Sequence, residues 1–93
     1  MTAEAKIKTE ELEIVYGVNK PLTVTDDEPI LNVKKGALGL FDIDESELNN
    51  FVLRAKIQGE KDEQLDEAQT VAFYKLHNKQ KVTLAAGTPF GSA

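Results

Sequence analysis

The last thirteen residues, KVTLAAGTPFGSA, include the glycine that is the clearest candidate in this chain for taking part in a chemical reaction. Lys81-Val82-Thr83-Leu84 alternates polar and apolar residues, as a half-buried strand does, and Gly87, Pro89 and Gly91 then prevent regular structure from continuing. Glycine has no Cβ, so a glycine backbone can thread a narrow channel into an enzyme. Two interpretations are open: the segment is an ordinary frayed terminus, or it is the working part of the molecule.

Other potentially reactive side chains are sparse. The chain has no cysteine, which excludes disulfides, thiolate metal sites and a cysteine nucleophile. His77 is the single histidine, with no second imidazole for a metal site and no nucleophile–base set around it, so we expect a loop residue in a protein that is not an enzyme. Asp42, Asp44 and Glu45 lack the glycine and later glutamate of a calcium loop, which favours a solvated turn. We expect no metal and no cofactor.

Composition narrows the class of protein further. Ninety-three residues make one domain at most, and a hydrophobic fraction of 41% is ordinary for a globular protein. A formal charge of −5 argues against nucleic acid as a partner. No apolar run approaches the ~18 residues of a membrane span. The opening residues MTAEAKIKTEE contain no signal-peptide core, so we expect a cytoplasmic protein.

Alternating patterns predict the strands. Residues 11–18 and 21–25 alternate, and Asn19-Lys20 between them is typical of a tight turn, which together predict a β-hairpin. FVLRAKIQ at 51–58 and KVTLA at 81–85 predict two more strands. The polar DESELNN stretch is expected to be a connection, GEKDEQ a charged turn, and the segment before the last strand compact, irregular or briefly helical.

A helix is predicted over residues 27–41. Thr25 or Asp26 is the expected cap, and Pro29 is tolerated in a first turn whose N–H groups have no partner within the helix. An apolar stripe at helical spacing faces the sheet. Its members are Ile30, Val33, Ala37, Leu40 and Phe41.

This order of elements predicts a two-layer α+β domain of the β-grasp type, a mixed sheet with one main helix on one face. We expect a flexible leader at 1–10, the folded domain at 11–86 and a flexible tail at 87–93. The predicted core consists of Leu12, Ile14, Leu22, Val24, Ile30, Val33, Leu53, Ile57, Leu65, Val71, Leu76, Val82 and Leu84.

Residues 64–84, QLDEAQTVAFYKLHNKQKVTL, resemble the second half of ubiquitin and its relatives. In that family a leucine opens a short strand, an acidic pair and a small turn residue follow, and a Thr-apolar pair begins a short helix. A tyrosine packs beneath it, and an aliphatic residue precedes an alternating last strand. Those positions are here Leu65, Asp66 with Glu67, Ala68, Thr70 with Val71, Tyr74, Leu76, and Val82 with Leu84. The resemblance covers roughly residues 11–91; Ala68 replaces the usual glycine, and DESELNN is an additional connection.

The resemblance places Gly91 at the family's terminal glycine. It implies that a peptidase removes Ser92 and Ala93, that an E1-like adenylating enzyme activates the Gly91 carboxylate, and that an E2-like conjugating enzyme passes it to target proteins. The family usually ends in Gly-Gly, whereas this chain has Phe90-Gly91, and Thr88-Pro89 replaces a flexible basic tail. These departures imply dedicated partner enzymes, of the kind found in a bacterial ubiquitin-like conjugation system.

The alternative is a β-grasp interaction module that docks a partner and carries an inert tail. Its binding surface is expected on the exposed sheet face, at Val15, Val52, Arg54, Lys56 and Ala85. A sulfur carrier is a weaker third option, because such carriers end in a bare Gly-Gly that this chain lacks.

Overall fold

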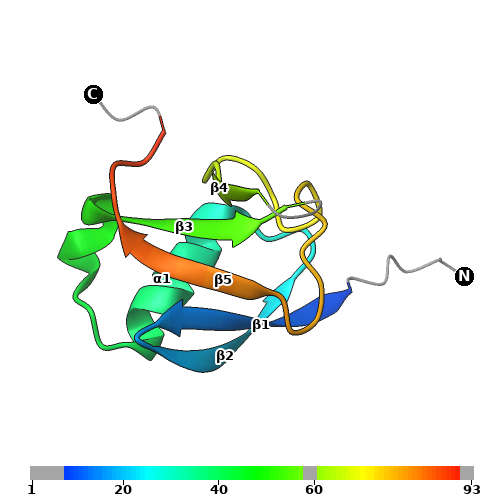
Figure 1. Cartoon of the computed structure of the whole chain (residues 1–93), viewed down its shortest axis with the longest axis horizontal. Coiled ribbons are helices and arrows are strands. Elements are labelled where there is room, and N and C mark those ends of the chain that lie inside the picture. The colour runs from blue at the N-terminus through cyan, green and yellow to red at the C-terminus, as the bar shows by residue number, and fades with distance from the viewer. Residues whose placement is uncertain (1–7, 58–60, 91–93) are drawn as a thin grey trace, which may run out of the picture.

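The computed structural model describes residues 8–57 and 61–90, so the expectations for Gly91, Ser92 and Ala93 lie outside the described residues. Figure 1 shows the arrangement of the elements. They are β1 (Thr9–Tyr16), β2 (Val18–Thr25), α1 (Ile30–Leu40), the short 3₁₀ helix η1 (Glu45–Asn50), β3 (Phe51–Lys56), β4 (Asp62–Gln64) and β5 (Lys81–Ala86).

The strands form one mixed sheet of five strands in the order β2-β1-β5-β3-β4. β1 and β5 run parallel in its centre, and every other pairing is antiparallel. Helix α1 lies across one face, behind the sheet in Figure 1, and no helix among the described residues covers the opposite face. This is the predicted α+β β-grasp fold. Within residues 8–57 and 61–90, no helix has the length and apolarity needed to cross a membrane.

The core lies between α1 and the inner face of the sheet, and the alternation of the strands accounts for it. Of the thirteen residues predicted to be buried, all but Leu22 and Ile57 are buried, and those two pack against the core while partly exposed. Leu22 lies on the edge strand β2 and Ile57 just beyond β3, where neighbouring chain covers them on fewer sides.

The N-terminal hairpin is longer than predicted, and its turn lies elsewhere. Thr9 and Glu10 belong to β1, so they are not part of a leader. The turn is at Gly17, whose φ of 79° is in the region that only glycine adopts without strain, while Asn19-Lys20 belongs to β2. Pro21 is accommodated in β2 because this is an edge strand, where a missing N–H need not leave a neighbour unpaired.

Helix α1 begins at Ile30, three residues later than predicted, with Pro29 as its N-cap and no side-chain cap from Thr25 or Asp26. A proline disfavours helical backbone geometry at the residue that precedes it, and this keeps Glu28 outside the helix. Glu28 instead accepts a hydrogen bond from the Thr25 backbone N–H at 3.1 Å, which stabilises the preceding turn.

Two connections also differ from the sequence prediction. The charged GEKDEQ stretch contains β4, and DESELNN contains η1. Residues 71–75 form hydrogen-bonded turns, which is one of the conformations expected for the segment before the last strand. Asp, Glu and Gln have low β propensity, so strand β4 forms through its pairing with the edge of β3, a tertiary contact that local patterns do not encode.

A buried ion pair joins the helix to the sheet. The side chain of Lys34 in α1 is fully buried, and its Nζ lies 2.5 Å from Glu67 Oε2 in the turn after β4. The same Nζ donates to the carbonyl of Phe51, the first residue of β3, at 3.0 Å. A buried ammonium is strongly unfavourable unless it is paired and hydrogen-bonded, so these contacts specify where the turn and β3 sit against α1.

We therefore predict that Glu67→Ala lowers the free energy of unfolding by about 3 kcal/mol, because it leaves the Lys34 ammonium without its counter-charge. The double variant Lys34→Met/Glu67→Leu should recover most of this loss, since it removes both charges. Urea unfolding followed by circular dichroism measures each value. Glu63→Ala in β4, an exposed position, is the control and should change stability by less than about 0.5 kcal/mol. Equal effects of Glu67→Ala and Glu63→Ala would contradict the role of the pair.

Candidate functional site

The segment after β5 lies against the sheet. The Gly87 N–H donates to the Asn50 carbonyl at 3.1 Å, which continues the pairing of β3 with β5. The Gln64 side chain in β4 then donates from Nε2 to the Thr88 carbonyl at 2.9 Å. Pro89 is buried, whereas Phe90 is 58% exposed. Figure 1 shows this segment turning from the end of β5 past the start of β3.

This contact corrects two expectations. The tail is predicted to be flexible from Gly87 onward, but the Gly87 N–H and the Thr88 carbonyl are hydrogen-bonded to the domain and Pro89 is buried. Val52 was predicted to be exposed on the binding face, but it is 2% exposed. A Cβ added to Gly87 would lie 2.9 Å from Val52 Cγ2, so the backbone at Gly87 approaches Val52 as closely as only glycine allows.

The remaining residues of the predicted surface lie on the outer face of the sheet, away from α1. Val15 pairs with Thr83 across β1 and β5, and Thr83 pairs with Arg54 across β5 and β3, so these side chains point to the same side. Arg54 makes a 2.6 Å ion pair with Asp62, in which both side chains are partly exposed. Ala85 is partly exposed and lies opposite the covered Val52.

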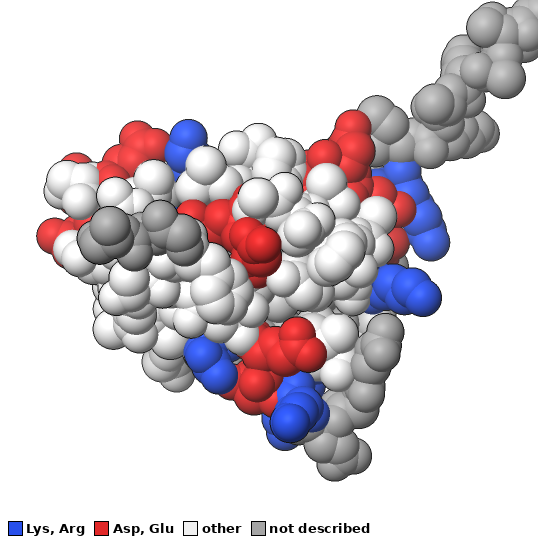
Figure 2. All heavy atoms as spheres, turned by 90° about the horizontal axis from the view of Figure 1, so that it is seen from above, with Lys and Arg blue, Asp and Glu red and all other residues white. Residues whose placement is uncertain are grey.

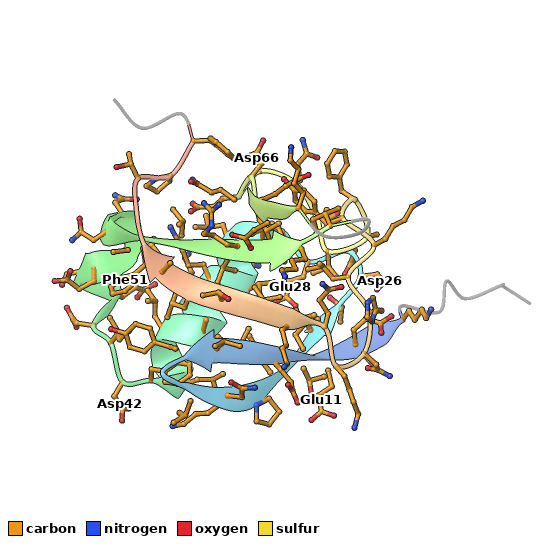
Figure 3. All side chains as sticks on the ribbon, in the orientation of Figure 1. Glu11, Asp26, Glu28, Asp42, Phe51 and Asp66 are labelled. Carbon is orange, nitrogen blue, oxygen red and sulfur yellow. The ribbon has the colours of Figure 1, made fainter. Side chains whose placement is uncertain are left out.

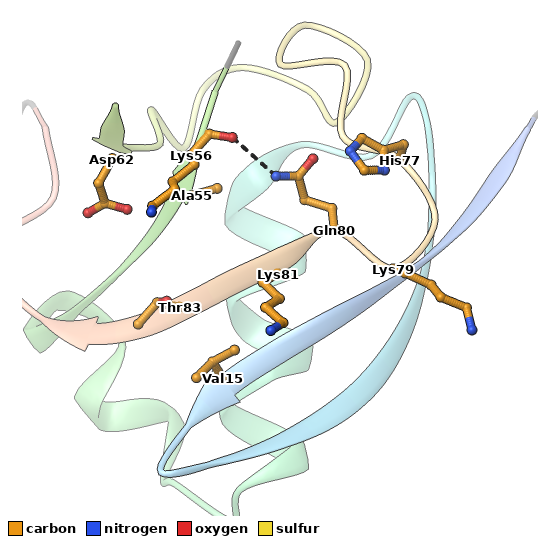
Figure 4. Close-up of a pocket in the computed structure, with 9 residues that line it drawn as sticks. All are labelled: Val15, Ala55, Lys56, Asp62, His77, Lys79, Gln80, Lys81 and Thr83. Carbon is orange, nitrogen blue, oxygen red and sulfur yellow. Dashed lines mark hydrogen bonds between the residues drawn. The ribbon is translucent and has the colours of Figure 1, made fainter. Parts of the chain in front are cut away.

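A groove lies on this outer face where β3 and β5 separate (Figure 4). The ladder between the two strands ends at the pair Arg54 and Thr83, and beyond it the Gln80 side chain donates to the Lys56 carbonyl at 3.2 Å. The groove has a volume of about 480 Å³, and Val15 and Thr83 are among the residues that line it.

The rim of the groove is mainly basic. Lys56, Lys79 and Lys81 line it together with His77, and none of the three lysines forms an ion pair with another residue in the described part of the chain. Asp62 also lines the groove, and its carboxylate is paired with Arg54. Acidic and basic side chains are interspersed on the face shown in Figure 2, so a rim with three lysines is a local feature of an acidic protein.

Sequence reasoning identified Val15 and Lys56 but missed the other lysines and Gln64. Lys81 and Thr83 occupy the polar positions of the alternating last strand, and this signal was sufficient to place them on the outer face. Gln64 carries no such signal, because its charged surroundings in the sequence predict a turn where the structure has strand β4. His77 is an exposed loop residue, as predicted.

Aromatic side chains close the end of the core beside the tail. The ring of Tyr16 packs edge-on against Phe41 and Phe51, with centroids 5.3 and 5.8 Å away. Phe51 pairs with Ala86, the last residue of β5, and Figure 3 shows it at the end of the sheet where the tail departs. The tail therefore begins next to a cluster of packed aromatic rings.

The acidic stretch at residues 42–45 has a structural explanation. The Asp44 carboxylate caps η1 by accepting hydrogen bonds from the hydroxyl and the backbone N–H of Ser46. Those bonds to the charged form lower the pKa of Asp44 from its ordinary value. Within the described residues, no cluster of three or more His, Asp or Glu side chains has the arrangement of a metal site.

The sequence matches no protein-family model and no curated protein. Solved structures nevertheless share the fold. The C-terminal ubiquitin-like domain of mouse tubulin-specific chaperone e superposes with a TM-score of 0.71 at 13% identity, over 99% of this chain and 100% of that one. The chain has the ubiquitin-like fold.

Two complexes contain similar domains as parts of longer chains. ATBAG1, solved in complex with HSP70, gives a TM-score of 0.67 at 18% identity over 83% of this chain. A chain of the pParkin–pUb–UbcH7 complex gives 0.63 at 14% identity over 85% of this chain. This chain covers only 40% and 23% of those two chains, and identities this low establish the fold and not the function.

We predict that ending the chain at Gly87 lowers the free energy of unfolding by about 1–2 kcal/mol, because it removes the bond from Gln64 and the buried Pro89. A chain ending at Phe90 keeps both contacts and is the control. Thermal melts of the two truncated chains beside the full chain make the comparison. Identical melting temperatures in all three would show that the contacts of residues 87–89 contribute nothing to stability.

Proposed function

We propose that this chain is a ubiquitin-like protein modifier, processed after Gly91 and joined through the Gly91 carboxylate to amines of target proteins. The observation that carries the proposal is that this glycine follows the last strand of a ubiquitin-like fold in the sequence. Gly91 comes five residues after the last residue of β5, and the described residues that precede it, 87–90, lie at the end of the sheet where β5 stops.

The proposed chemistry proceeds in steps that need no catalytic group of this chain. A peptidase hydrolyses the bond between Gly91 and Ser92. An E1-like enzyme joins the carboxylate to AMP from ATP, releasing pyrophosphate, and an enzyme thiol then displaces AMP. The thioester passes to an E2-like enzyme, and the attacking amine of the target expels the thiol. In this proposal the chain is a substrate in each step and not an enzyme, and the reaction takes place in the cytoplasm, where ATP is available.

The Phe90-Gly91 sequence and the packed residues before it support dedicated partner enzymes, which we propose to belong to a bacterial conjugation system. An activating enzyme with a channel for Gly-Gly would have to accept the phenylalanine side chain in place of a hydrogen atom. The likeness to domains solved in protein complexes, with HSP70 in one case and with pUb and UbcH7 in the other, supports protein partners in general.

We predict that the full chain, incubated with the peptidase, adenylating enzyme and conjugating enzyme of its own organism, loses Ser92 and Ala93 and forms covalent adducts. Gly91→Val should abolish the adducts without lowering the melting temperature, because a branched Cβ blocks a channel that fits glycine. Intact mass and denaturing gels measure the two steps. Gly39→Ala, at a position where an added Cβ meets nothing within 4 Å, is the matched control and should still form adducts.

Two results would contradict this proposal. One is adduct formation by a chain that ends at Phe90. The other is cleavage after Gly87, which would move the reactive carboxylate to a different residue.

The basic groove favours a second candidate function, that of an interaction module that is not conjugated. Its lysines and its small floor residues suit an extended partner segment rich in carboxylates. Because Lys81 is the first residue of β5 and Lys79 lies two residues before it, this surface is at the other end of that strand from the tail and needs no contribution from Gly91.

For this second candidate we predict that a fluorescein-labelled hexaglutamate peptide binds the chain at low salt. Binding should weaken steeply as the Debye length falls from about 10 Å at 0.1 M to about 3 Å at 1 M salt. Lys79→Gln/Lys81→Gln should weaken it at least about tenfold, as loss of two close charge pairs implies. Lys35→Gln/Lys75→Gln changes net charge equally outside the groove and is the control. Equal losses in both variants, measured by fluorescence anisotropy, would exclude a specific site.

A further inference from the structure

The contacts of residues 87–89 leave only a short segment before the proposed processing site at Gly91. An extended chain spans about 3.4 Å per residue, so the five residues from Gly87 to Gly91 can reach roughly 17 Å beyond β5. With residues 87–89 held against the sheet, only Phe90 and Gly91 remain to enter an enzyme, a reach of roughly 7 Å. A channel that encloses several backbone residues requires the tail to leave the sheet first.

We propose that Val52 and Gln64 form a dock for residues 87–89, and that the balance between docked and released tail determines how readily Gly91 reaches its processing and activating enzymes. This inference rests on the proposed modifier function and adds its regulation. Val52 and Gln64 are positioning residues, because they act on Gly91 only through the tail.

Each contact of the dock is of a kind that single substitutions can disrupt. The Gln64 amide donates to a backbone carbonyl, so Gln64→Glu keeps the shape of the side chain and removes the donor. The Gly87 backbone approaches Val52 so closely that Gly87→Ala brings a methyl group to 2.9 Å from Val52 Cγ2. Gly87 does not have a positive φ, so an alanine at this position would clash with Val52 but would not strain the backbone.

The dock also predicts a compensating pair. Val52→Ala removes the methyl groups that the added Cβ at residue 87 would meet, so Gly87→Ala/Val52→Ala should hold the tail better than Gly87→Ala alone. If Gly87→Ala releases the tail through a steric clash with Val52, the double variant should hold the tail better than Gly87→Ala alone. If each substitution instead loosens the whole domain, the double variant should hold the tail less well than either single variant.

The first measurement needs no partner enzyme. Amide hydrogen exchange by NMR reports the opening of the bond from the residue 87 N–H to the Asn50 carbonyl. We expect Gln64→Glu and Gly87→Ala to raise exchange at residue 87 by about three- to tenfold, the effect of losing one ordinary hydrogen bond or contact. Gln80→Glu is the matched control, because Gln80 also donates to a backbone carbonyl but at the other end of β5. It should leave exchange at residue 87 unchanged, with thermal melts verifying that every variant is folded.

The second measurement uses the partner peptidase at limiting concentration. The variants with a released tail, Gln64→Glu and Gly87→Ala, should be cleaved after Gly91 about three- to tenfold faster than the wild type, in proportion to their hydrogen-exchange rate at residue 87. Gln80→Glu should match the wild type, and the compensating pair should fall between the wild type and Gly87→Ala.

The outcomes separate the two proposals. Unchanged exchange at residue 87 in both Gln64→Glu and Gly87→Ala would overturn the dock. Faster exchange with an unchanged cleavage rate would overturn the regulation and leave the modifier function standing. Faster exchange with neither cleavage nor adducts in any variant, including the wild type, would overturn the modifier function and the regulation with it, while supporting the dock as a structural feature.

Discussion

The position of the Lys34 ammonium constrains the rest of this structure. It lies in the apolar layer between α1 and the sheet, where a charge without partners is strongly disfavoured. Its two partners come from the start of β3 and from the turn after β4. One interaction thus ties together the helix, the strand and the turn, and it specifies their geometry more than it adds to stability, because hydrophobic packing could replace it.

Both candidate surfaces depend on that geometry. The start of β3 carries Val52, and β4, just before the Glu67 turn, carries Gln64, so the residues that hold the tail belong to the elements that Lys34 positions. The far end of β3 separates from β5 and opens the basic groove. The sheet therefore offers two different surfaces at its two ends, one occupied by the chain itself and one bordered by lysines.

A shared fold leaves function open, because ubiquitin-like domains are found in proteins with different roles. The modifier proposal depends on Gly91 and the interaction-module proposal on the groove, which lie at different places on one scaffold. The contacts of residues 87–89 bear on both proposals. In the first they would limit the reach of Gly91, and in the second the approach of Gly87 to Val52 keeps a buried apolar residue beside Ala85 out of the exposed outer face.

The sequence by itself determined the fold class, most of the core and the polar face of the last strand, because side-chain periodicity encodes which face of an element is buried. Prediction from the sequence placed the start of α1 and the hairpin turn a few residues away from their actual positions. Pro29 determines the first through the backbone conformation it imposes, and Gly17 determines the second through its positive φ. Only the tertiary structure decided that Asp62–Gln64 is a strand, that Lys34 is buried and that Gly87 packs on Val52. These features arise from contacts between residues far apart in the chain. Such contacts stabilise the structure only once the sheet has assembled, so no local sequence pattern predicts them.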